Sequence, residues 1–186
     1  GFPVSASLGI FALVFAFSLG VTAGVVSALY RHSWMDRSFM TAATVGIAVP
    51  NFVLASLSIM VFVFQLQWFP AAGWGTLKQI ILPALCLGAP FAAYIARLSR
   101  TGMLEVMGQD YIRTAKAKGL SQFQIIKNHA IKNALNPVVT AISGWFASML
   151  AGAVFVEYIF GWNGLGKEIV NALNTLDLPV IMGSVL

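Results

Sequence analysis

Long uncharged apolar stretches alternate with short charged ones along this chain of 186 residues. The uncharged stretches are residues 1–30, 38–77, 79–96, 133–156 and 178–186. A helix needs about 20 apolar residues to cross a hydrocarbon core of about 30 Å, and it satisfies its own backbone polar groups there. The pattern therefore predicts an all-α fold, a polytopic transmembrane helical bundle. The expected spans are residues 8–29, 41–64, 80–97 and 137–156, with a further span beginning near residue 179.

The composition supports insertion into a membrane. Apolar residues make up 59% of the chain and charged residues 9%, whereas soluble domains carry roughly 25% charged residues. Mean hydropathy is +0.84. The first apolar stretch lacks a basic n-region and is too long for a signal peptide. Because no Met opens the chain and Leu186 lies inside the last apolar run, we expect a truncated sequence.

Small residues recur at every fourth position in two of the expected spans, where they let a neighbouring helix approach closely. They are Ala12, Ala16, Gly20, Gly24 and Ala28 in the first span, and Thr140, Gly144, Ser148 and Gly152 in the last complete one. We predict helix packing at Gly20, Gly24, Gly144, Ser148 and Gly152. These small residues would face another helix of the same bundle, a second subunit or a transport pathway.

The expected spans hold few groups for chemistry. Pro50 and Pro90 should kink or interrupt their helices. No span carries an ionisable residue at its centre or a buried charged pair, which proton- or sodium-coupled carriers and redox pumps usually show. The one cysteine, Cys86, allows no intrachain disulfide. We therefore expect no catalytic residue, no metal site and no cofactor.

The distribution of Lys and Arg predicts the orientation. Nine of these residues fall in the loops at 30–40 and 97–133, and two fall in the loops at 65–79 and 157–178. The positive-inside rule places the first pair of loops in the cytoplasm and the second pair outside. This bias accounts for the net charge of +5, so nucleic-acid binding is not expected.

Residues 97–133 carry seven of the eleven Lys and Arg residues. Residues 110–118 favour a helix, and Gly119 fits the left-handed position that ends one. Ser121 to Gln124 reads S-x-x-Q, a capping box that begins a second helix. Asn136 and Pro137 then suit the start of the next span. A structured basic segment at a membrane surface indicates docking of a soluble partner, with attachment to anionic lipid as the alternative.

This stretch resembles the cytoplasmic EAA loop of ABC importer permeases, in which an E-A-A triplet, three residues and a Gly precede a second helix. Gly119 takes the Gly position, and Arg113, Thr114 and Ala115 fall on the triplet. Y-I-R-T-A-K-A-K-G-L and H-A-I-K-N-A-L-N-P resemble the variant of the oligopeptide, dipeptide and nickel branch. Similar motifs are F-P-V-S-A-S-L-G, L-P-A-L-C-L, A-R-L-S-R-T-G-M-L-E-V and E-Y-I-F-G-W-N-G-L-G. The whole chain resembles a B-type permease subunit.

The resemblance implies one half of a type I importer in the bacterial cytoplasmic (inner) membrane. Residues 1–186 would be a single transmembrane permease domain that lacks the family's first span and most of its last, with residues 98–136 as its coupling loop. The implied partners are a second permease (a heterodimer), two cytoplasmic ATP-binding subunits that hydrolyse ATP, and an extracytoplasmic substrate-binding protein. The implied ATPase contacts are Arg113, Thr114, Ala115, Gly119, Leu120, Ser121 and Phe123.

Short peptides are the expected substrate of this permease. Nickel complexes and oligosaccharides remain open within the same branch. A stand-alone channel and a membrane scaffold subunit remain open outside it.

The sequence Gly161 to Lys167 reads G-x-x-x-x-G-K, close to a phosphate-binding loop. However, Glu168 stands where a Ser or Thr should meet Mg²⁺, no strand precedes the motif, and the loop is expected outside the cell. We predict a tight external turn there, with docking of the binding protein as a further use.

Overall fold

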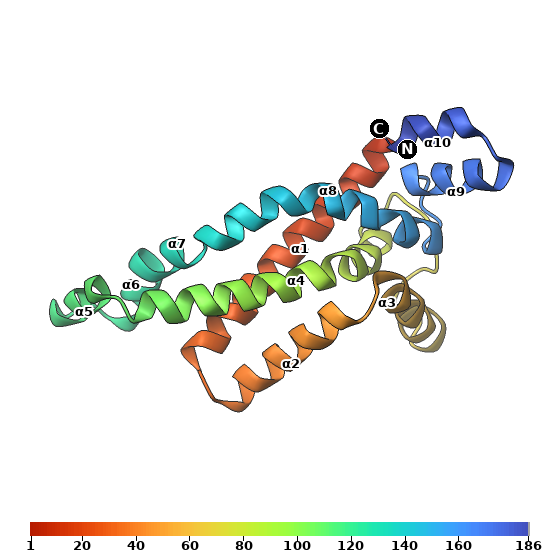
Figure 1. The fold of residues 1–186 in the computed structure, drawn as a ribbon. Helices are drawn as coiled ribbons and strands as arrows, with labels where there is room; N and C mark the ends of the chain where they lie inside the picture. Colours follow the sequence, from red (N-terminus) through yellow and green to blue (C-terminus); the bar gives the residue numbers. More distant parts are fainter. Residues whose placement is uncertain (186) are drawn as a thin grey trace. The chain divides into compact units, whose positions relative to one another are not determined.

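The computed structural model describes residues 1–185, apart from the side-chain surroundings of residues 146, 147, 150–152, 184 and 185. None of the described residues lies in a strand, which confirms the predicted all-α class (Figure 1). The elements are α1 (Phe2–Leu29), α2 (Trp34–Ala48), α3 (Asn51–Ser58), the π-helical η1 (Ile59–Gln65), α4 (Leu77–Met107), α5 (Asp110–Ala117), α6 (Gln122–Ile125), the π-helical η2 (Ile126–Ala130), α7 (Ile131–Ala134), α8 (Asn136–Ile159), α9 (Leu165–Thr175) and α10 (Leu178–Val185).

Four of the five expected spans correspond to single helices. Among the described residues, α1 and α4 are long and apolar enough to cross a membrane, and α2 with α3 and η1 makes a third span if the broken helix counts as one. Helix α8 covers the span expected at 137–156, and α10 begins one residue before the expected start at 179.

The second expected span, residues 41–64, is not one continuous helix. Helix α2 ends at Ala48, and α3 begins at Asn51 with Pro50 as its N-cap residue in an extended conformation. A proline has no N–H to donate, and it disfavours helical geometry in the residue before it. The interruption expected at Pro50 is therefore confirmed. Pro90 lies inside the continuous helix α4, together with Pro83.

Helix α4 is longer than the expected span at 80–97. Its 31 residues correspond to a length of about 46 Å at a rise of 1.5 Å per residue, more than a hydrocarbon core of about 30 Å requires. The additional C-terminal turns contain Arg100 and continue towards α5. The cytoplasmic region predicted from charge thus includes the end of this helix as well as the segment after it.

The described chain divides into two compact units. Unit 1 comprises Gly1–Phe15, Val49–Pro90 and Phe146–Leu186, and unit 2 comprises Ala16–Ala48 and Phe91–Trp145. Helices α1, α4 and α8 each contribute residues to both units.

The core of unit 1 brings the beginning of α1 against the beginning of α4. Leu8 and Ala12 of α1 are fully buried, as is Leu87 of α4. A Cβ atom on Gly88 would lie 2.7 Å from the carbonyl oxygen of Ala12, so the two backbones touch there. Trp162 and Phe160 complete the same unit as its largest fully buried side chains.

Unit 2 has two buried apolar clusters. The first contains Ala16, Ile95 and Val138, with Phe91 and Trp145 packed beside it. The second joins the ends of α1 and α4 to the segment α5–α7 (residues 110–134), and its buried members are Ala28, Met103, Ile112, Ala115, Ile125, Ala130 and Ala134. The segment α5–α7 is therefore held within unit 2 by a buried cluster that it shares with α1 and α4.

Candidate functional site

Helix α5 ends in the turn that the sequence predicts. Gly119 has φ +81°, in the left-handed region. The Gly119 N–H donates to the Lys116 carbonyl at 2.9 Å, and the Leu120 N–H donates to the Ala115 carbonyl at 3.3 Å. This is the Schellman pattern, with Leu120 and Ala115 in the same apolar cluster. The positive φ predicted for Gly119 is confirmed.

The second helix of the segment begins at the predicted capping box. The Ser121 N–H donates to Gln124 Oε1 at 3.0 Å, and the Gln124 N–H donates to Ser121 Oγ at 3.4 Å. The helical path then widens into the π-helical turn Ile126–Ala130 before α7. This turn is not expected from the sequence, which predicts an ordinary α-helix with Ile125, Ile126, His129, Ala130, Asn133 and Ala134 on one face. Ile125, Ala130 and Ala134 are buried, but Asn133 is exposed.

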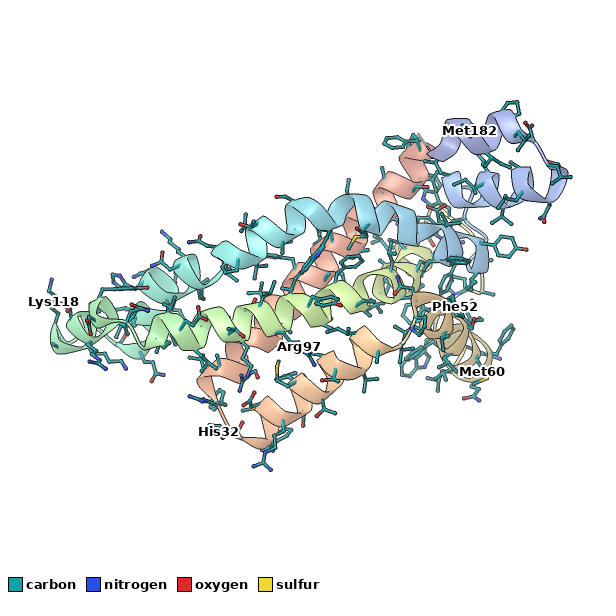
Figure 2. The ribbon with its side chains drawn as sticks, in the orientation of Figure 1. His32, Phe52, Met60, Arg97, Lys118 and Met182 are labelled. Carbon is teal, nitrogen blue, oxygen red and sulfur yellow. The ribbon has the colours of Figure 1, made fainter. Side chains whose placement is uncertain are left out.

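The expected ATPase contacts divide into an outer and an inner set. The exposed residues are Arg113, Thr114, Gly119, Ser121 and Phe123, and Phe123 is 71% exposed. Ala115 is buried and Leu120 is half-buried, both in the cluster of unit 2. Figure 2 shows Lys118 at the tip of the turn between α5 and α6. The outer set lies at the surface of the segment, while the inner set holds the segment together.

The outer surface of the segment is basic and exposes two aromatic side chains, Tyr111 and Phe123. It carries five Lys and Arg residues against the single Asp110. Arg113 lies 3.5 Å from Asp110, in an exposed pair of the kind that contributes little. The Lys127 ammonium group lies 5.9 Å from the centroid of the Phe123 ring. An exposed phenyl ring beside a cation, on a basic segment, fits a protein surface that is apolar at its centre and acidic around it.

The small residues predicted for helix packing lie in two different environments. A Cβ atom on Gly20 would lie 2.6 Å from the Ala92 carbonyl oxygen, and one on Gly24 would lie 2.6 Å from Ser99 Cβ. The two glycines thus lie directly against α4 in unit 2. Gly144 has open space around it, Ser148 is exposed, and the surroundings of Gly152 lie outside the described residues.

Sequence reasoning missed a buried ion pair in unit 2. Asp36 is 5% exposed, and its carboxylate accepts hydrogen bonds from Arg100 Nε and Nη2 at 2.8 Å each. The two residues lie outside the spans expected from hydropathy, 64 positions apart. The only signal was an Asp two residues before an uncharged stretch, which does not identify a partner.

A second missed residue is Glu157, which lies in the last turn of α8 and is fully buried. Its Oε2 accepts the Gly166 N–H at 2.8 Å, and Ser5 Oγ accepts the Leu165 N–H at 2.9 Å. The first amides of α9, where a phosphate-binding loop would hold its anion, are thus occupied by the chain's own side chains. Gly161 adopts φ +64° in the preceding turn. The tight turn expected at this motif is present, but α9 after it was not expected.

The described residues hold no group of three or more His, Cys, Asp and Glu side chains placed to bind a metal ion. Cys86 is buried, with its thiol 3.4 Å from the Ser58 hydroxyl oxygen.

Long apolar helices, a broken span and a separate basic helix-turn-helix define an integral membrane protein of the helical permease class. Residues 20–186 match the family of binding-protein-dependent transport system inner membrane components, and the chain belongs to this family.

Two curated relatives are similar in sequence to this chain over nearly its whole length. The dipeptide transport system permease protein DppB of Bacillus subtilis is 48% identical over 184 residues, which cover 99% of this chain and 60% of DppB. The glutathione transport system permease protein GsiC of Escherichia coli is 41% identical over 179 residues, covering 96% of this chain and 58% of GsiC. The chain thus spans about three-fifths of the length of these relatives.

The fold is also similar to that of a solved chain of the MetNI methionine ABC transporter, described in an inward-facing conformation. The TM-score is 0.73 at 17% identity, over 97% of this chain and 86% of that one. This likeness confirms the fold class expected from the resemblance to ABC importer permeases.

Proposed function

We propose that this chain is part of a permease subunit of an ATP-driven importer of short peptides in the bacterial inner membrane. It forms the translocation pathway with a second permease and receives substrate from an extracytoplasmic binding protein. Two cytoplasmic ATP-binding subunits hydrolyse ATP, and the chain itself performs no catalysis. The segment α5–α7 is the surface on which one of these subunits docks.

The geometry of the segment α5–α7 carries this proposal. Two short helices meet at a fixed Schellman turn and rest on a buried cluster shared with α1 and α4. Their outer face exposes Arg113 and Phe123. A stand-alone channel needs no such rigid, exposed element, and a scaffold needs no tight connection from it to membrane-crossing helices.

The names of the relatives support short peptides as the substrate. DppB is named for dipeptides and GsiC for glutathione, itself a tripeptide. The test is uptake of labelled di- and tripeptides by vesicles that hold the complete transporter, with and without ATP. We expect uptake only with ATP and binding protein. Uptake without ATP favours a channel, and no uptake under any condition favours a scaffold.

Docking is tested by substitution of the outer residues in the complete protein. Because central apolar and Arg anchors dominate small interfaces, we expect Phe123→Ala and Arg113→Ala each to weaken ATPase co-purification about tenfold or more. Lys132→Ala is the matched control, since it removes the same charge from an exposed position of α7. If Arg113→Ala and Lys132→Ala act equally and Phe123→Ala has no effect, the segment binds anionic lipid through its total charge.

A further inference from the structure

Asp36 receives four hydrogen bonds where α1, α2 and α4 meet in unit 2. Arg100 donates two of them, at 2.8 Å each, from Nε to Oδ1 and from Nη2 to Oδ2. The Ser27 hydroxyl donates the third, and the backbone N–H of His32 donates the fourth at 2.9 Å. His32 lies in the turn between α1 and α2, as Figure 2 shows. This carboxylate thus joins the end of α1, the turn and the start of α2 to α4.

Stability alone does not explain a buried pair of this kind. Replacing a buried ion pair by apolar residues of similar volume is often neutral or stabilising, because desolvation of the two charges offsets their attraction. A bidentate Arg–carboxylate pair instead fixes the distance and the orientation of the two helices that carry it. The pair in unit 2 therefore fixes the position of the start of α2 against α4.

The same turn of α4 makes the contacts to the segment α5–α7. Gly102 lies so close to the Ala134 carbonyl oxygen that no Cβ atom would fit between them. Met103, fully buried, packs in the cluster that contains Ile112. Asn133 Nδ2 donates to the Tyr111 hydroxyl oxygen at 2.9 Å, which ties α7 to α5. The segment is thus in backbone contact with α4 two residues from Arg100.

We propose that the Asp36–Arg100 pair is the joint through which a displacement of the segment α5–α7 is passed to α2. Asp36 and Arg100 are then positioning residues for ATP-driven transport and contact neither substrate nor nucleotide. This inference rests on the proposed function. A close-packed interior does not absorb a shift of α4 locally, so α2 moves with α4 as long as the pair holds.

The first test measures transport and ATP hydrolysis together in the complete transporter. We expect Arg100→Gln and Asp36→Asn to lower the amount of peptide transported per ATP hydrolysed about tenfold. The first variant leaves the buried Asp36 carboxylate without its partner, and the second leaves the half-buried Arg100 guanidinium without its partner. Arg100→Lys keeps the charge but loses the bidentate geometry, and its ratio should fall between those of the wild type and Arg100→Gln. Arg37→Gln is the matched control, since Arg37 is exposed next to Asp36 and donates to the His32 carbonyl oxygen at 3.4 Å within the same turn.

The second test follows the movement itself and does not depend on transport. Single cysteines at Ser38 of α2 and Lys118 of the α5–α6 turn, both exposed, are modified by a thiol reagent with and without ATP, in a background without Cys86. In the otherwise wild-type transporter, ATP should change the modification rate at both positions. With Arg100→Gln, the change should persist at Lys118 and disappear at Ser38.

Three results have distinct meanings. If the wild type shows no ATP-dependent uptake, the proposed function is wrong. If uptake is ATP-dependent but the variants transport as much peptide per ATP as the wild type, the proposed role of the pair is wrong. It is also wrong if ATP still changes the modification rate of the cysteine at position 38 in the Arg100→Gln variant. If Arg100→Gln and Arg100→Lys lose transport in strict proportion to assembled complex, the pair serves folding only, which also overturns the joint.

Discussion

At the scale of single residues, the contacts described above differ in how far apart the two partners lie along the chain. Gly119 and the Ser121–Gln124 capping box belong to local patterns, and both are present as predicted. Asp36 and Arg100 find one another only after three helices have packed, so no local pattern indicates their pairing. Glu157 was assigned to a loop because hydropathy falls at its charge, although the helix continues through it.

Gly119 provides a test of backbone strain without steric interference. A Cβ atom at this position meets no other atom within 4 Å, so the cost of a substitution comes from φ +81° alone. We expect Gly119→Val to destabilise the turn by about 1–2 kcal/mol and Gly119→Asn by less, because Asn tolerates left-handed geometry. Hydrogen exchange of residues 110–124 measures the effect.

The control for this substitution is Gly108→Val in the turn before α5, where φ is not in the left-handed region. ATP-driven transport by Gly119→Val should fall more than its membrane insertion does. Wild-type transport by a normally inserted Gly119→Val protein would show that the turn has no mechanical role.

Glu157 provides a second test at this scale, since it caps α9 from a buried position. Glu157→Ala removes the acceptor of the Gly166 N–H, and a buried donor without a partner costs about 1–3 kcal/mol. Glu157→Gln keeps an acceptor oxygen and should cost less. We expect faster proteolysis within α9 for the alanine variant. Glu168→Gln, at an exposed side chain in the first turn of the same helix, is the control and should leave the rate unchanged.

At the scale of elements, hydropathy predicts the number of long apolar segments better than it predicts their ends. Helices α4 and α8 extend beyond the expected spans because polar residues are acceptable in a helix once it leaves the hydrocarbon. Helix α1 begins six residues before its expected span, at Phe2, within the same uncharged stretch. The break at Pro50 was readable from the residue type. The π-helical turn Ile126–Ala130 was not, because its residues suit an ordinary α-helix equally well.

The two ridges of small residues lead to a prediction for elements. Gly24→Ala places a Cβ against Ser99 Cβ and the backbone nitrogen of Arg100 in α4, whereas Gly144→Ala places a Cβ in open space. Overpacking of a tight contact costs about 1–3 kcal/mol. We therefore expect Gly24→Ala to lower the thermal unfolding midpoint of the detergent-solubilised protein, and Gly144→Ala to leave it unchanged.

The same pair of variants distinguishes the uses of the two ridges. If Gly144 faces a second permease, Gly144→Ala should reduce co-purification of the two permeases while the single subunit keeps its stability. Equal loss of stability in the two variants would contradict the difference in their surroundings.

At the scale of the whole molecule, the class of the protein was predictable because membrane solvation constrains every span at once. Apolar length, the absence of a charge at the span centres and the asymmetry of Lys and Arg all point to one kind of protein. The ion pair and the cap of α9 were not predictable, because each depends on which faces of the helices meet.

The orientation of the chain in the membrane is the last prediction, and it follows from the split of nine cations against two. Cysteines introduced at Gln122 and Lys127 of unit 2 should react only with reagents on the cytoplasmic side. Those at Trp74 and Asn163 of unit 1 should react only with reagents outside the cell. All four positions are exposed, so a lack of reaction from one side reflects the membrane rather than burial. Cys86, 3% exposed, should react from neither side in the unmodified protein and serves as the internal control. Labelling of Gln122 from outside intact cells would reverse the orientation and remove the segment α5–α7 from the compartment in which ATP is hydrolysed.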